Sequence, residues 1–137
     1  MYPALSFLYW SLSIVLFDLG EHEKAQAFID EAIILALKCN AKHFEGLSRI
    51  QLGWILGKTD PNKFDRAEES ILKGINMSEE LRLKPWSSIG YLQLGEFYTD
   101  IGQKEKAQKN LKKAERMFRD MGMDYWLVKT REILKRL

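Results

Sequence analysis

The sequence is poor in the residues that disulfide-rich proteins, metal sites and β-sandwiches require. Among its 137 residues it has 1 Cys, 2 His, 3 Pro and 9 Gly. The lone Cys39 cannot form an internal disulfide or a cysteine-rich zinc site, and it favours a reducing, cytoplasmic compartment. His22 and His43 leave little material for a metal centre, so we expect no metal and no cofactor. The shortage of turn residues disfavours a β-sandwich.

An excess of charge of one sign is also missing. The chain has 21 Lys and Arg against 19 Asp and Glu, and its formal net charge of +2 does not by itself indicate a polyanionic partner. Hydrophobic residues make up 46% of the chain, which is enough for the core of one domain. The bias toward Leu, Ile, Ala, Glu and Lys favours helix. We therefore expect a single all-α domain over residues 1–137.

The N-terminal segment has no charged residue from Tyr2 to Phe17. A secretory signal would need positive residues before the apolar run and a small-residue cleavage site after it. A membrane-spanning helix needs about 20 apolar residues, whereas this run contains three serines and stops at Asp18. The sequence predicts neither, and we expect a chain that contacts no membrane and is a piece of a longer protein.

A pattern of eight positions recurs along the chain and indicates helical hairpins. Its clearest copy is Tyr91, Leu94, Gly95, Tyr98, Gly102, Ala107, Leu111 and Ala114. Spacings of three and four place the first four on one helix face, and Gly102 ends that helix. The last three form the inner face of a second helix. A copy with identical offsets begins at Tyr9, and a degenerate one includes Leu52 and Gly53.

These offsets resemble the tetratricopeptide repeat, whose pattern is an aromatic residue, Leu-Gly, another aromatic residue, Gly, and then Ala, an apolar residue and Ala. That repeat is about 34 residues long, and the longer steps in this chain indicate lengthened helices. The resemblance covers nearly the whole chain. It implies an α-α superhelix of three helical hairpins with a C-terminal capping helix, and a protein-binding domain that is not an enzyme.

The last third of the chain carries a narrower resemblance. Its segments 90–98, 117–118 and 121–127 are similar to the ends of repeat regions in bacterial class III nucleotide cyclases, predicted ATPases and large transcriptional activators. This likeness implies a regulatory C-terminal piece of a larger protein.

Caps and breakers place the predicted helices. Pro is tolerated in the first turn of a helix, and Gly commonly follows the last. The expected helices are 3–19, 22–38, 41–57, 63–83, 85–102, 104–121 and 124–137. The repeats are then about 3–40, 41–83 and 85–121, followed by the capping helix 124–137. We expect them to stack as a short right-handed solenoid.

No arrangement of residues points to catalysis. Gly57-Lys58-Thr59 is similar to the end of a phosphate-binding loop, but that loop needs four residues between its first Gly and the Gly-Lys pair. Only three residues separate Gly53 from Gly57, and no strand is predicted before them. Adjacent pairs of glutamates point to different helix faces and cannot act together as acid and base.

Basic residues crowd the helix predicted at 104–121. They are Lys104, Lys106, Lys109, Lys112, Lys113, Arg116 and Arg119. Glu105 precedes Lys109 by four positions and Glu115 precedes Arg119 by four, which is ordinary pairing on a helix surface. A phosphate-binding track should also carry aromatic stacking residues. We therefore expect a solvated outer face and no nucleic-acid partner.

The first helix of each hairpin lines a concave groove in the solenoid that the resemblance implies. Its positions outside the packing pattern are the candidate binding residues. The first repeat offers Phe7, Trp10, Ile14 and Phe17, the second Leu47, Ile50, Trp54 and Lys58, and the third Ile89, Leu92, Glu96, Thr99 and Asp100. The groove is predicted to be aromatic and apolar at its N-terminal end and polar to acidic at the other.

The helix predicted at 3–19 is apolar all round, and such a helix is normally buried all round. Beyond the residues that pack within the hairpin, it carries Phe7, Leu8, Trp10, Ile14, Val15 and Phe17. The candidates to cover it are a preceding repeat, a second copy of the chain and a peptide ligand. We expect a preceding repeat in the natural protein and, for the isolated chain, a homodimer through Phe7, Trp10, Ile14 and Phe17.

Two functional hypotheses follow from the sequence. The first is a non-catalytic module of a signalling or regulatory protein that binds a protein or peptide partner. The alternative is a regulatory C-terminal piece of a nucleotide cyclase or ATPase, whose catalytic domains lie outside this chain.

Overall fold

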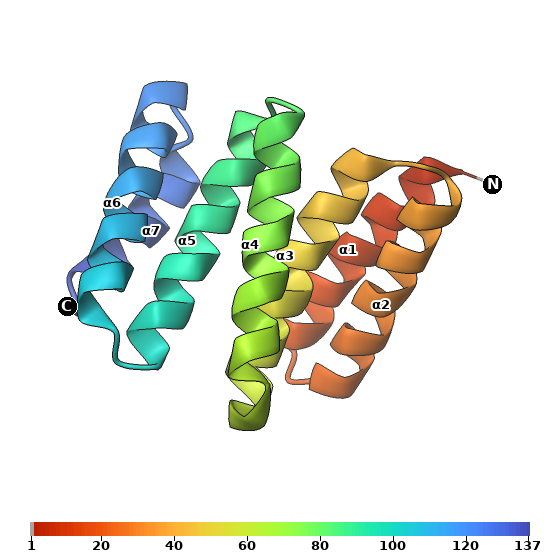
Figure 1. Cartoon of the computed structure of the whole chain (residues 1–137), viewed down its shortest axis with the longest axis horizontal. Helices are drawn as coiled ribbons and strands as arrows, with labels where there is room; N and C mark the ends of the chain where they lie inside the picture. Colours follow the sequence, from red (N-terminus) through yellow and green to blue (C-terminus); the bar gives the residue numbers. More distant parts are fainter. Residues whose placement is uncertain (1) are drawn as a thin grey trace.

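The computed structural model describes residues 2–137, and this part of the chain contains helices and no strand (Figure 1). The helices are α1 (Pro3–Asp18), α2 (His22–Lys38), α3 (Lys42–Thr59), η1 (Pro61–Lys63), α4 (Phe64–Glu80), α5 (Lys84–Asp100), α6 (Lys104–Met121) and α7 (Asp124–Leu134). The predicted all-α fold class is confirmed.

The bounds of α2 and α6 are those predicted from the sequence. The largest differences are at α4 and α7. The helix expected at 63–83 begins with a separate 3-10 turn, in which the Asp60 side chain accepts a hydrogen bond from the Asn62 N–H at 2.9 Å. It ends at Glu80 because Arg82 takes a left-handed conformation with φ of 57°. The last helix ends at Leu134 instead of 137.

The turns after the second helices repeat one backbone feature. Asn40, Arg82 and Gly122 follow α2, α4 and α6, and their φ angles are 51°, 57° and 69°. A left-handed residue at this place lets its successor donate back to the last turn of the helix, as Leu83 N–H does to Ser78 O at 2.9 Å. The same left-handed conformation also follows α1 and α5, at Gly20 and Gly102.

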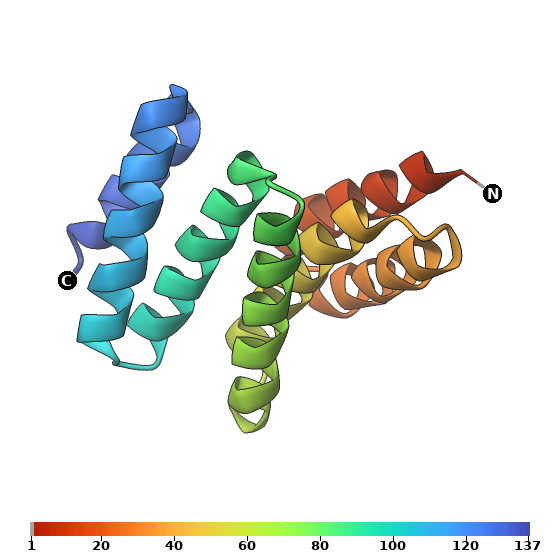
Figure 2. The ribbon, with the colours of Figure 1, turned by 45° about the horizontal axis from the view of Figure 1, so that its top comes forward.

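The hairpins α1–α2, α3–α4 and α5–α6 stack in sequence, with α7 packed on α6 (Figure 1). Each first helix also contacts the next first helix, in the order α1, α3, α5 and α7. Among residues 2–137, the backbones of the second helices α2, α4 and α6 do not contact one another. The first helices therefore lie on the inner side of an α-helical repeat superhelix, and the chain ends lie at its opposite ends (Figure 2).

Small residues let the two helices of each hairpin approach closely. A Cβ atom on Gly53 of α3 would lie 2.5 Å from Ile71 Cγ1 and 2.6 Å from Ala67 O of α4. The equivalent residue of α1 is Ser13, whose hydroxyl donates to Ala25 O of α2 at 2.8 Å. The predicted small-residue positions are thus points of close contact within the hairpins.

Candidate functional site

The first helices α1, α3 and α5 supply the face on which the sequence analysis places a binding groove. These helices lie side by side on the inner side of the superhelix. Some of the predicted groove residues are accessible there, and others are part of the core.

Four predicted groove residues are buried, which corrects the prediction for them. They are Leu47, Ile50 and Leu92, each 1% exposed, and Ile89, which is 8% exposed. Ile50 is covered from two sides, since it lies where a Cβ on Gly74 of α4 or on Gly90 of α5 would meet it. These residues hold the hairpins together and are not available to a partner.

A polar cluster joins α3 to α5 and contains four of the predicted residues. The Trp54 indole N–H donates to Glu96 Oε2 at 3.1 Å. Lys58 Nζ lies 2.5 Å from the same oxygen and 2.7 Å from Asp100 Oδ2. The ammonium also lies 5.6 Å from the centroid of the Trp54 ring. We call Trp54, Lys58, Glu96 and Asp100 the α3–α5 cluster.

The charge balance of the α3–α5 cluster is negative, because one ammonium faces two carboxylates. Burial opposes the charge on Lys58, but its hydrogen bonds to Asp100 and Glu96 outweigh that cost and raise the pKa of Lys58 above its usual 10.5. The lysine side chain is 27% exposed and that of Glu96 is 12% exposed. The cluster therefore presents a rigid, partly desolvated surface with a surplus negative charge.

Phe17 extends the α3–α5 cluster to α1. Its ring meets that of Trp54 edge to face, with 4.6 Å between centroids, and stacks on the imidazole of His22 at 4.2 Å. Ile14, one turn earlier in α1, is half-buried. Thr99 donates its hydroxyl to Gly95 O at 2.8 Å and so is already satisfied within α5. Side chains from three hairpins thus meet at one place.

A second group of aromatic side chains crosses the N-terminal ends of the same helices. Phe7 lies 5.2 Å from Trp10 and 5.7 Å from Phe44, and Phe44 lies 6.0 Å from Trp86, between ring centroids. His43 packs against Phe44 at 4.2 Å. We call Phe7, Trp10, Phe44 and Trp86 the aromatic row. The row crosses all three repeats, so the aromatic part of the groove is not confined to the first repeat, where it was predicted.

Phe44, His43 and Trp86 were not among the residues predicted for the groove. A signal was present, because Phe44 and Trp86 occupy equivalent positions of the second and third repeats, as Trp54 and Glu96 do. Neither residue belongs to the eight-position pattern, and their neighbours on α1 become apparent only when the helices are packed.

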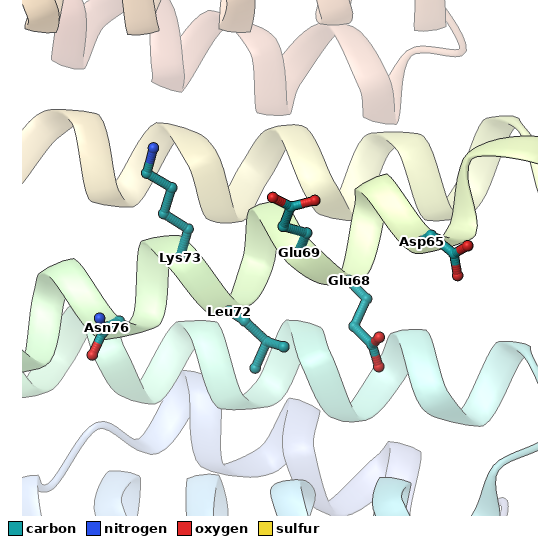
Figure 3. Close-up of a pocket in the computed structure, with 6 residues that line it drawn as sticks. All are labelled: Asp65, Glu68, Glu69, Leu72, Lys73 and Asn76. Carbon is teal, nitrogen blue, oxygen red and sulfur yellow. The ribbon is translucent and has the colours of Figure 1, made fainter.

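A shallow depression on α4 is lined by Asp65, Glu68, Glu69, Leu72, Lys73 and Asn76 (Figure 3). All six residues come from one helix, and most of them are exposed. Because no second element closes the depression, it offers no enclosed site.

The basic residues of α6 do not form the predicted surface pairs. Glu115 pairs with Arg131 of α7 at 3.1 Å instead of with Arg119, and Glu105 has no ion pair with Lys109 within residues 2–137. Lys113 Nζ lies 4.2 Å above the Tyr91 ring, and Lys106 Nζ lies 5.4 Å from the Tyr98 ring. Two of the lysines thus pack on α5 instead of forming a free basic track.

The described part of the chain lacks two further features. Among residues 2–137 there is no group of three or more His, Cys, Asp or Glu side chains that could hold a metal ion. No helix in the same range combines the length and the apolar character that crossing a membrane requires.

Comparison with protein families gives two matches to the tetratricopeptide repeat, at residues 8–39 and 90–120. These segments cover most of the hairpins α1–α2 and α5–α6. The matches and the all-helical architecture support a tetratricopeptide repeat domain, a fold that is generally non-catalytic and serves protein interaction. A search of curated proteins finds no significant match to this chain.

Proposed function

We propose that residues 1–137 form one non-catalytic interaction module that binds a segment of a partner protein along the face of α1, α3 and α5. The observation that carries this proposal is the α3–α5 cluster with Phe17, in which side chains of three successive hairpins meet on the inner face. The remaining candidate contact residues are Phe7, Trp10, Ile14, Phe17, Trp54, Lys58, Glu96, Thr99 and Asp100.

The cluster is organised before any partner arrives. Hydrogen bonds and ring contacts hold Trp54, Glu96 and Lys58 in place, so binding need not freeze these side chains. Aromatic residues on a rigid surface are also the side chains that contribute most to protein interfaces.

The groove favours a peptide with a defined distribution of side chains. The aromatic row fits apolar or aromatic groups, and the surplus carboxylate of the α3–α5 cluster fits a basic group. We therefore expect ligands that carry apolar residues toward one end and Lys or Arg toward the other.

Selection from a random peptide library displayed on phage tests this function, with the folded chain immobilised as bait. Selected peptides should share the apolar-plus-basic composition and should lose at least tenfold in affinity against Trp54→Ala and Asp100→Asn. The matched control is Leu72→Ala, an exposed apolar residue on the outer helix α4, which should bind as wild type does. Peptides that bind the groove variants and wild type equally would contradict the proposal.

We also propose that this module belongs to a larger cytoplasmic signalling or regulatory protein, the nucleotide cyclases and ATPases being the candidate classes. Support comes from the likeness of segments 90–98 and 121–127 to the repeat regions of such proteins. Sequencing the natural transcript upstream of the first codon tests this proposal. An upstream reading frame that encodes neither catalytic class would remove the cyclase and ATPase candidates.

A further inference from the structure

One face of α1 is both apolar and open. Leu8 is 49% exposed and Val15 is 54% exposed, and Leu12 between them is half-buried. The face contains no charged residue, because the first charge after Tyr2 is Asp18. Of the residues expected to mediate a homodimer, Phe7, Trp10, Ile14 and Phe17, the three aromatic ones pack against α3 or against one another. We call Leu8, Tyr9, Leu12 and Val15 the open face.

The same positions are buried in the other first helices. The repeat offsets make Leu8 equivalent to Ser48 of α3 and Gly90 of α5, and Ser48 is 1% exposed. They make Val15 equivalent to Ile55 and Phe97, which are 0% and 3% exposed. The open face is therefore exposed because of its place in the stack and not because of its residue type.

The helix that covers these positions is in each case the second helix of the preceding hairpin. Helix α2 packs on α3, and α4 packs on α5. The missing Cβ of Gly90 leaves room for Ile75 of α4, and the Phe97 ring meets Phe64 of α4 at 5.8 Å. An apolar stripe on the covering helix thus faces the equivalents of Leu8 and Val15.

Polar contacts fix the register of the α4–α5 interface. The Tyr98 hydroxyl donates to Glu68 at 2.6 Å, and the Tyr91 hydroxyl donates to Glu79. The α1 residue equivalent to Tyr91 is Tyr9, and no hydrogen bond within residues 2–137 uses its hydroxyl. The open face therefore keeps the phenol that pairs with a carboxylate in the equivalent interface.

We propose that the open face of α1 is a docking site for an amphipathic α-helix, which packs on α1 as α4 packs on α5. The equivalent α4–α5 interface defines the chemistry of this helix. The helix carries a large apolar residue facing Val15 and a small residue facing Leu8, because the Leu8 side chain fills the space that Gly90 leaves to Ile75. It carries a carboxylate facing Tyr9, as Glu79 faces Tyr91.

The other end of the stack argues against a head-to-tail second copy as the occupant. The exposed residues of helix α7 include the charged Lys129, Glu132 and Lys135 as well as the apolar Tyr125 and Val128. Packing these three charged side chains on the uncharged open face would desolvate ions without partners. The open face instead continues the series of interfaces that α2 and α4 already make.

A fused helix tests the proposal directly. A copy of residues 61–83 is placed immediately before Tyr2, the equivalent of Lys84, so that α4 and its own connection precede α1 as they precede α5. The copy carries Ile75→Ala to accommodate Leu8. Docking should raise the midpoint of thermal unfolding by about 5 °C and should slow hydrogen exchange of α1 amides.

Two variants test whether the stabilisation comes from packing of the fused helix on the open face. Phe64→Glu in the fused copy and Val15→Glu in α1 should each abolish the rise in midpoint. Without the fusion, Val15→Glu should unfold at the wild-type temperature, because the side chain is largely in solvent. A fusion that leaves the midpoint unchanged would overturn the proposal, as would a loss of stability in unfused Val15→Glu.

Light scattering tests whether a second copy of the chain, and not an amphipathic helix, occupies the open face. If the unfused chain is a dimer and Val15→Glu converts it to a monomer, the occupant is a second copy and the proposal is wrong. The peptide selection on the groove reports on a different surface, so the two proposals fail independently.

Discussion

Trp54 of α3 donates its indole N–H to Glu96 of α5 at 3.1 Å, and the two residues occupy the same position in successive repeats. An aromatic residue in one hairpin is thereby fixed by a carboxylate in the next. Lys58 binds the same carboxylate, so the contact is both a part of the candidate binding surface and a tie between hairpins.

Replacing Glu96, the acceptor that Trp54 and Lys58 share, should weaken the contact between α3 and α5. Glu96→Gln removes the charge that faces Lys58 while keeping an oxygen for Trp54, and we expect it to lower the free energy of unfolding by about 1 kcal/mol. Urea denaturation followed by circular dichroism measures the change. Glu132→Gln, at an exposed position of α7, is the control and should unfold like wild type; equal stability of the two variants would contradict the prediction.

Stability should depend on pH through Lys58. Because its pKa in the folded protein is raised above 10.5, the stabilisation from its charge is complete below pH 10.5 and is lost as the pH rises through the folded-state pKa. The difference in unfolding free energy between wild type and Lys58→Met should therefore be constant from about pH 7 to 9.5 and shrink above about pH 10.5.

The control for the pH series is Lys109→Met, an exposed lysine without an ion pair within residues 2–137. This variant measures how removal of a lysine charge that makes no ion pair changes the free energy of unfolding at alkaline pH. A Lys58→Met difference that stays constant up to pH 12, after this change is subtracted, would show that the ion pairs do not act as described.

A methyl group at Gly53 should be costly, although alanine is normally preferred over glycine in a helix by about 1 kcal/mol. The added Cβ would lie 2.6 Å from the carbonyl oxygen of Ala67, and backbone at this distance cannot move aside without separating α3 from α4. We expect Gly53→Ala to destabilise the chain by about 2 to 3 kcal/mol in urea denaturation.

Gly46→Ala gives the comparison for this prediction. Its Cβ would be 3.2 Å from Met77 Cβ and 3.3 Å from Gly74 O, which small adjustments can relieve. The loss of stability at Gly46 should be clearly smaller than at Gly53. Equal losses would mean that the close contact at Gly53 is not what limits the approach of the two helices.

Two serines of α1 should differ in their contribution to stability. Ser13→Ala removes a buried hydroxyl that donates to Ala25 O of α2, leaving that carbonyl without this bond, and should cost about 1 kcal/mol. Ser11 donates only to Phe7 O in its own helix at 3.0 Å, so Ser11→Ala should be neutral. Thermal unfolding of both variants measures the difference, and a neutral Ser13→Ala would contradict it.

The sequence by itself determined the hairpins. Spacings of three and four among Tyr91, Leu94, Gly95 and Tyr98 define one helix face, and the same offsets from Tyr9 define another. Local geometry is sufficient for this, because helix periodicity decides which residues share a face. For the same reason the bounds of α2 and α6, which lie between clear turn residues, agree with the structure.

Only the tertiary structure decided which of those faces are covered. Leu47 and Ile50 were expected in the groove and are buried, whereas Leu8 and Val15 are open at positions that are buried in α3 and α5. Burial depends on whether a neighbouring helix is present, and one repeat unit carries no information on its neighbours. The partners of long side chains, such as Arg131 for Glu115, likewise depend on how the helices pack.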